Sequence, residues 1–174
     1  MCSLCMPLPS ALRSPAFLRN FIFGVEDSLV STVGLLSGVA IAGVPGRTIL
    51  LTGVVLIFVE AFSMGVGSFL SEQSSREFTQ RAELPVRRAR TSSIVMFVSY
   101  FVAGFIPLSP YVFFPTALAF PLSIAASLIA LFLLGFVGAR IFRMSAARHG
   151  LEMLILGGGA ILIGVVVGLL VPAV

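Results

Sequence analysis

The chain has 174 residues, of which 58% are hydrophobic and only 10% are charged, and its mean hydropathy is +1.12. Soluble domains carry about 25% charged residues, so this composition excludes a water-soluble globular domain and indicates an integral membrane protein. The net charge of +4 predicts contact with anionic lipid head groups. No nucleic-acid partner is expected, because the sequence has no separate basic domain.

Five segments are apolar over the roughly 20 residues that a membrane-spanning helix requires. In chain order they are Phe21–Gly43, Thr48–Ser71, Ser92–Phe113, Thr116–Ile141 and Leu151–Val171. The third and fourth lie in one uncharged run from Thr91 to Ala139. We expect the prolines between Pro107 and Pro115 to separate them, because proline ends or kinks a helix. The predicted fold class is therefore an all-α integral membrane protein with five transmembrane helices.

The positions of the basic residues predict the orientation of these helices. All eleven are arginines, and ten of them fall in the N-terminal segment or in the second and fourth connections, against Arg47 alone on the other side. Positively charged connections stay in the cytoplasm, so the N-terminus is expected there and the C-terminus outside. The expected organisation is a cytoplasmic tail over residues 1–20 and one membrane domain over 21–174, with a short cytoplasmic loop at 72–91.

The first expected helix carries two acidic residues, Glu26 and Asp27. Helical geometry places Asp27 on one face with Ser31 and two glycines, whereas Glu26 points about 100° away. An ionised Asp at a helix centre costs about 2.5–3.5 kcal/mol on insertion scales, so such groups usually face a partner or a water-filled path. Both carboxylates are candidate metal ligands. For both, an interfacial position near the helix N-terminus is the alternative.

The second expected helix carries Glu60 near its middle, on one face with Met64 and Gly67. The two helices are joined by a short turn and run antiparallel, which places Asp27 at the depth of Met64 and Ser31 at the depth of Glu60. We therefore expect carboxylate and thioether ligands to line a shared gap. The alternatives are a protonated Glu60 that bonds a neighbouring helix, and a Met64 that only fills space.

Other chemistry-bearing residues give weaker signals. Cys2 and Cys5 form one C-x-x-C pair, which we interpret as reduced thiols in a tail, with a metal or redox pair as the alternative. His149 has no neighbouring residues that complete a nucleophile or metal set, so no enzyme activity is predicted. Gly164 and Gly168 predict a close helix contact without identifying the partner helix.

Three short motifs stand out in the first three helices: "DSLVS", Asp27–Ser31, "SMGVG", Ser63–Gly67, and "FIPLSPY", Phe105–Tyr111. In the first two motifs the chain resembles the vacuolar iron transporter family, and the third is similar to that family's proline-bearing third helix. The resemblance implies a homodimer that moves ferrous iron, and often manganese, out of the cytosol in exchange for protons, with the ion path near the dimer axis and no prosthetic group. It further implies that Asp27 is the family's intramembrane aspartate and Met64 its pathway methionine. Ser31, Ser63 and Gly67 are the supporting residues of this path.

The sequence departs from this family at two places. Many members have "GEY" where this chain has "GSF", Gly67–Phe69, and we expect Glu60 to supply the acidic ligand instead. Many members also insert a glutamate-rich metal-gathering domain between the second and third helices. Here that connection, Glu72–Arg90, holds three glutamates against five arginines. The resemblance is therefore to a short member that lacks the cytosolic metal-binding domain.

These expectations combine into a proton-coupled exporter of a divalent metal. A thioether disfavours magnesium and calcium, and carboxylates suit ferrous iron and manganese. A carboxylate in a low-dielectric site can hold a proton when empty and release it when a cation arrives. The alternative is a non-transporting membrane protein whose helices form a structural or partner-binding module. The expected location is a prokaryotic cytoplasmic membrane.

Overall fold

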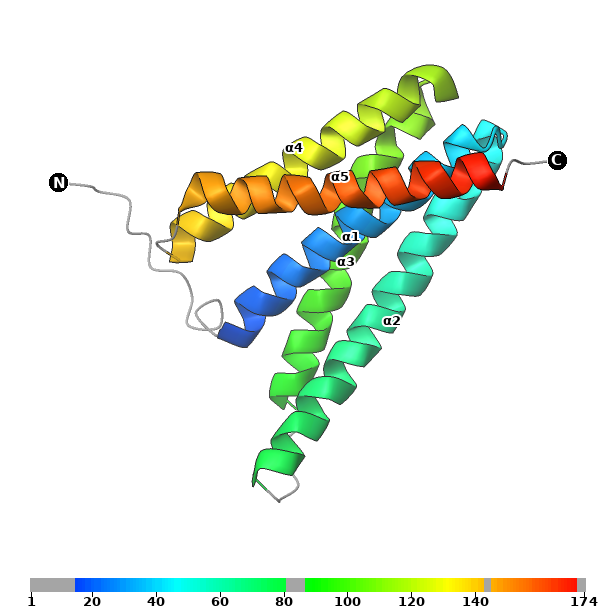
Figure 1. Cartoon of the computed structure of the whole chain (residues 1–174). Coiled ribbons are helices and arrows are strands. Elements are labelled where there is room, and N and C mark those ends of the chain that lie inside the picture. Colours follow the sequence, from blue (N-terminus) through cyan, green and yellow to red (C-terminus); the bar gives the residue numbers. More distant parts are fainter. Residues whose placement is uncertain (1–14, 81–86, 143–144, 172–174) are drawn as a thin grey trace.

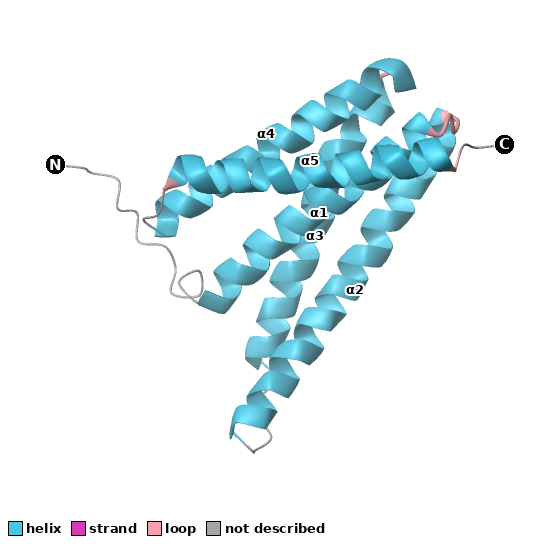
Figure 2. Ribbon diagram, in the orientation of Figure 1, coloured by secondary structure: helices cyan, strands magenta, loops and turns pink. Residues whose placement is uncertain are grey.

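The computed structural model describes residues 15–80, 87–142 and 145–171, which form five helices and, in these ranges, no strand (Figures 1 and 2). In chain order they are α1 (Pro15–Ile41), α2 (Gly46–Gln80), α3 (Arg87–Phe113), α4 (Thr116–Phe142) and α5 (Ala146–Leu170). Each contains a stretch long and apolar enough to cross a membrane. The prediction of an all-α multi-pass membrane protein with five spans is confirmed.

Two helices extend beyond the apolar segments that predicted them. α1 begins at Pro15, inside the expected tail, and α2 continues through a polar segment to Gln80. The loop expected at 72–91 is therefore helical at 72–80 and from 87 onward, and residues 81–86 lie outside the described part. Polar contacts accompany the extension, because Arg19 pairs with Glu72 at 3.7 Å. Hydropathy marks where the membrane ends, and a helix of polar residues can continue past that point.

α1 is the central helix of the molecule. It packs extensively against α3 on one side and α5 on the other, whereas α2 packs mainly on α3 and α4 mainly on α5. Figure 1 shows α2 and α3 diverging from α4 and α5, with α1 between the two pairs. The contact between α1 and α2 is comparatively small, although these helices are consecutive in the chain.

Two prolines lie inside α3 near its C-terminal end, Pro107 and Pro110. Pro110 has no N–H to donate to the carbonyl of Ile106, and the Ser109 hydroxyl donates to that oxygen at 2.9 Å instead. Ser123 of α4 donates to the Pro107 carbonyl at 2.6 Å. These side-chain hydrogen bonds satisfy backbone acceptors within the membrane, where water is absent. The break between the third and fourth helices lies at Phe114 and Pro115, inside the predicted turn.

α5 approaches α1 through glycines on both helices. A Cβ atom placed on Gly38 would lie 2.6 Å from the carbonyl oxygen of Gly164, and one on Gly168 would collide with the carbonyl oxygen of Gly38. Only residues without side chains permit this backbone approach, which provides van der Waals contact in lipid. The predicted glycine contact is confirmed, and its partner is α1.

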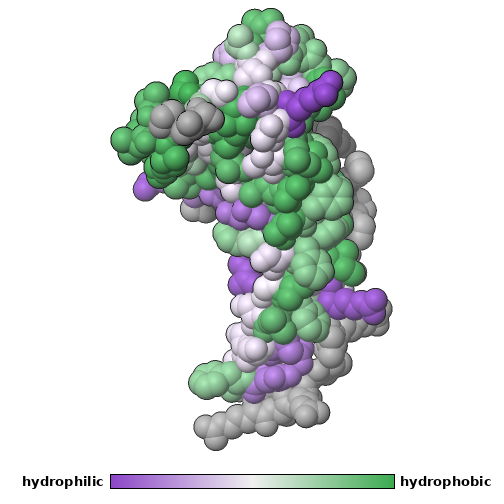
Figure 3. Space-filling view, turned by 90° about the vertical axis from the view of Figure 1, so that its right-hand side faces the viewer, coloured by the Kyte–Doolittle hydropathy of each residue, from purple (hydrophilic) through white to green (hydrophobic). Residues whose placement is uncertain are grey.

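The outer surface of the bundle is largely apolar. Figure 3 shows hydrophobic side chains over much of one face, with the hydrophilic ones in separate groups. Large exposed hydrophobic residues occur along α2 and α5, including Phe58, Phe62, Leu162 and Leu169. Such a surface is suited to lipid or to another apolar helix surface, and not to water.

Candidate functional site

A cavity of about 770 Å³ lies between α1, α2 and α5. Three side chains able to bind a cation border it, namely Asp27 and Ser31 of α1 and Glu60 of α2. The rest of its lining consists of glycine and apolar residues, namely Val30, Gly34, Leu35, Gly38, Val39, Ala42, Val44, Leu56, Ala160, Ile163, Gly164, Val167, Gly168 and Val171. The polar face predicted for the first helix therefore borders a cavity, and the glycine contact with α5 lies on the same side of α1.

Glu60 is held by two hydroxyl groups from two other helices. Ser31 Oγ donates to Glu60 Oε2 at 3.1 Å, and the hydroxyl of Tyr100 on α3 donates to the same oxygen. Ser31 Oγ and the Tyr100 hydroxyl are themselves 2.7 Å apart. The expectation that Ser31 and Glu60 lie at one depth is confirmed. The cluster joins α1, α2 and α3 inside the membrane-spanning part.

Asp27 borders the same cavity but makes no hydrogen bond or ion pair with another described residue. It is half-buried. The charged groups that interact with it electrostatically are Glu26 and Glu60, both of its own sign. Carboxylates gathered in this way are stabilised by a bound cation or a proton, because either removes the mutual repulsion.

The remaining predicted ligands, Glu26 and Met64, and the remaining supporting residues, Ser63 and Gly67, do not line the cavity. Glu26 and Met64 are half-buried, and Ser63 and Gly67 are exposed, but none of the four borders it. At the level of Met64, α2 packs on α3, where Ser93 Oγ donates to the Gly65 carbonyl at 2.7 Å. The expected shared gap therefore contains Asp27 and Glu60 but not Met64, because α2 diverges from α1 toward its C-terminal end (Figure 1).

Among the described residues of one chain, the acidic side chains do not by themselves form a metal site of three or more ligands. Across residues 15–80, 87–142 and 145–171, no group of three or more His, Cys, Asp or Glu side chains is placed to hold one ion. Cys2 and Cys5 lie outside these ranges. The metal-binding roles of Asp27, Glu60, Met64 and Glu26 stay predictions.

A second polar cluster joins the same three helices away from the cavity. Asn20 of α1 is only 3% exposed, and its Nδ2 donates to Ser68 Oγ of α2 at 3.1 Å and to the Ser92 carbonyl of α3 at 3.4 Å. Ser68 stands where the "GEY" motif of the resemblance has its glutamate. In this chain the residue at that position accepts a partly buried hydrogen bond from α1.

Tyr100 is not among the site residues predicted from the sequence, although one general property could have indicated it. Its side chain is fully buried in a membrane-spanning helix. A phenol there must hydrogen-bond within the protein, because lipid offers no partner. Periodicity compares residues along one helix, so it could not show that the partners of Tyr100 lie on α1 and α2.

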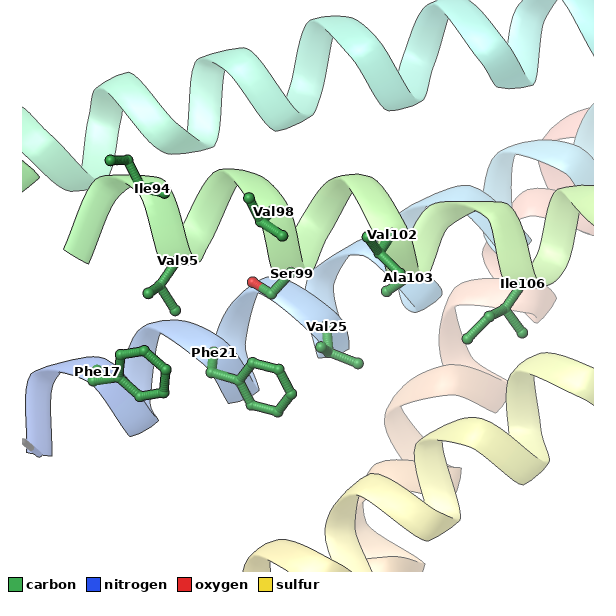
Figure 4. Close-up of a pocket in the computed structure, with 10 residues that line it drawn as sticks. All are labelled: Phe17, Phe21, Val25, Ile94, Val95, Val98, Ser99, Val102, Ala103 and Ile106. Carbon is green, nitrogen blue, oxygen red and sulfur yellow. The ribbon is translucent and has the colours of Figure 1, made fainter. Parts of the chain in front are cut away.

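Two further cavities lack the chemistry of a cation site. One of about 480 Å³ lies between α1 and α3, and Ser99 is the polar residue among the ten that line it (Figure 4). Another, of about 320 Å³, has His149 in its apolar wall. His149 Nδ1 lies 2.9 Å from Glu152 Oε2, and Arg148 pairs with the same carboxylate at 3.1 Å. His149 thus belongs to a local cluster at the start of α5.

Comparisons with known proteins identify the family of this chain. A family model described as "VIT family" matches residues 18–90 and 80–169. Vacuolar iron transporter 1 of Tulipa gesneriana is 25% identical over 80% of this chain and 81% of its own length. Vacuolar iron transporter homolog 5 of Oryza sativa subsp. japonica is 29% identical over 88% of this chain and 79% of its own. Vacuolar iron transporter 1 of Arabidopsis thaliana is 22% identical over 80% of each. The chain belongs to the VIT family.

Proposed function

We propose that this chain transports ferrous iron and manganese out of the cytosol in exchange for protons, and that it is a transporter and not an enzyme. The observation that carries the proposal is the cavity that Asp27 and Glu60 share between membrane-spanning helices. Relatives that carry the name vacuolar iron transporter support iron as cargo. Manganese is included because its ligand preferences are close to those of ferrous iron.

In the proposed mechanism, the two carboxylates alternate between protons and a cation. Asp27 has no described partner that would have to be displaced when a metal arrives. Glu60 keeps its hydroxyl partners on one oxygen. A cation that enters the cavity displaces protons, and protons from the other side later displace the cation. The closely packed backbones of α1 and α5 provide a contact across which the helices could rock as access alternates.

We further propose that transport is carried out by a homodimer. Two carboxylates and a hydroxyl from one chain provide fewer ligands than the six oxygen ligands typical of a manganese site. A second copy of the cavity, together with water, would supply the remaining ligands. In this proposal Met64, Glu26, Ser63 and Gly67 line the path between this cavity and the cytoplasm.

The first test is transport by purified protein in liposomes. Asp27→Asn and Glu60→Gln each remove a negative charge at almost constant volume, and we expect both to reduce initial uptake of Fe²⁺ to the level of empty liposomes. The matched control is Glu152→Gln, which removes a carboxylate outside the cavity and is expected to transport at the parent rate. Parent-rate transport by Asp27→Asn and Glu60→Gln, at equal protein levels, would refute the site assignment.

The second candidate function is a non-transporting structural or partner-binding module. It is favoured because no three His, Cys, Asp or Glu side chains among the described residues are grouped so that they could hold one metal ion. Proton release measured with a pH-sensitive dye separates the two functions. An antiporter releases protons in a metal-dependent manner, and a structural module does not.

A further inference from the structure

Tyr100 lies where α1, α2 and α3 meet and has no exposed surface. Its backbone is held as well as its hydroxyl, because Ser28 Oγ of α1 donates to the Tyr100 carbonyl at 2.7 Å. One turn further along α3, a Cβ atom on Gly104 would lie 2.7 Å from Cγ1 of Ile57 on α2 and 3.0 Å from Ser28 Oγ. The three helices thus approach closely beside this ring, which leaves the phenol little room to change direction.

The two hydroxyl groups at Glu60 act on the same atom. Ser31 and Tyr100 both donate to Oε2, whereas no described residue donates to Oε1. The carboxylate is planar and is attached to α2 through the Glu60 side chain. Hydrogen bonds that hold Oε2 therefore also restrict the positions that Oε1 can occupy. Glu60 borders the cavity, and Oε1 is its oxygen without a protein donor.

We infer that Tyr100 is a positioning residue for metal, which holds Glu60 through Oε2 so that Oε1 is available to a divalent cation in the cavity. The inference rests on the proposed function and adds to it a residue of α3. Metal-binding carboxylates are commonly oriented by such hydrogen bonds, and loss of the orienting group typically weakens metal affinity about 10–100-fold. Ser31 assists from α1 through its hydrogen bond to the same oxygen.

Tyr100→Phe tests the inference because it keeps the ring and removes only the hydroxyl. We expect the KM for Mn²⁺ uptake in proteoliposomes to rise about tenfold, with a smaller change in the maximal rate, because the ligand is misplaced but not lost. Ser31→Ala should raise KM in the same direction. The matched control is Tyr111→Phe, which removes the other tyrosine hydroxyl of the sequence, also on α3 but outside the cavity lining. Its KM should equal that of the parent.

Fluorescence supplies a second readout that does not require transport. The sequence has no tryptophan and two tyrosines, so Tyr111→Phe leaves Tyr100 as its one tyrosine emitter. Titrating this variant with Mn²⁺ should change the Tyr100 emission, and adding Glu60→Gln should abolish the response. The same titration of Tyr100→Phe, which retains Tyr111, should give a much smaller change.

The outcomes separate this inference from the proposed function. If the parent transports Mn²⁺, Asp27→Asn does not, and Tyr100→Phe keeps the parent KM, the inference is wrong and the proposed function stands. If the parent transports nothing but the Tyr100 emission of Tyr111→Phe still responds to Mn²⁺ and Glu60→Gln abolishes that response, the positioning role stands and transport is wrong. If Tyr100→Phe does not fold, the inference is tested by the KM of Ser31→Ala and by the fluorescence titration of Tyr111→Phe.

Discussion

At the scale of single residues, the membrane-spanning part contains polar groups in two separate settings. Ser31 and Tyr100 both donate to Glu60 beside a cavity, whereas Asn20 donates to Ser68 within a packed junction. Both clusters join α1, α2 and α3. Because a buried polar group in lipid requires a protein partner, either cluster can stabilise the fold. Only the first also borders a space that an ion could occupy.

The Asn20 junction is expected to be structural. Asn20→Ala removes hydrogen bonds to α2 and α3, and hydrogen bonds between membrane helices contribute about 0.6–1.7 kcal/mol each. We expect a lower thermal unfolding temperature in detergent and an unchanged KM for metal. The control is Thr79→Ala, whose exposed hydroxyl bonds a carbonyl of its own helix. A change in KM together with unchanged stability would contradict this assignment.

Residue types alone predicted part of the candidate site. Asp27 and Glu60 could be identified because carboxylates are rare and costly in a membrane span, and Ser31 because helical periodicity places it beside Asp27. Met64 was placed with them on the assumption that α1 and α2 run side by side throughout. The structure shows instead that α2 packs mainly on α3. Tyr100 was missed because its partners lie on other helices.

At the scale of elements, hydropathy predicted the number of spans and the position of each. It could not predict that α2 reaches Gln80, since polar residues continue a helix in water as well as apolar residues do in lipid. Nor could the glycines of the last helix identify α1 as their partner, although α1 carries glycines at the same spacing of four. A contact between two helices depends on how the helices are arranged in space. The sequence of one helix alone does not specify that arrangement.

Glycines on α5 provide a matched test of this contact. Gly164→Ala places a methyl group against the Gly34 carbonyl, whereas Gly158→Ala places one in open space on the same helix. We expect Gly164→Ala to lower the free energy of unfolding by about 1–3 kcal/mol through overpacking. Gly158→Ala should leave it unchanged or raise it by about 0.5–1 kcal/mol, because alanine is the better helix former. Equal effects in thermal unfolding would argue against the close contact.

At the scale of the whole molecule, α1 lies between two helix pairs, which also contact each other where α3 packs on α4. α2 and α3 lie on one side of it and α4 and α5 on the other. The cavity is bordered by α1 and by one helix of each pair, α2 and α5. Relative movement of the pairs would change the shape of this cavity while each pair kept its own packing. This architecture is compatible with alternating access, in which one group of helices moves against another around a fixed site.

The orientation of the molecule can be tested with its own cysteines. Cys2 and Cys5 are the two cysteines of the sequence, and both precede α1. Because ten of the eleven arginines fall on the side of the N-terminus, the positive-inside rule places these thiols in the cytoplasm. In a bacterial host, a membrane-impermeant maleimide should therefore label them in everted vesicles and not in intact cells. A variant in which both native cysteines are replaced (Cys2→Ser, Cys5→Ser) and one new cysteine is introduced (Arg47→Cys) should give the opposite pattern. Labelling of the native cysteines in intact cells would show that the N-terminus lies outside. Asp27 and the α1 N-terminus would then face outward, and the proposed direction of transport would be reversed.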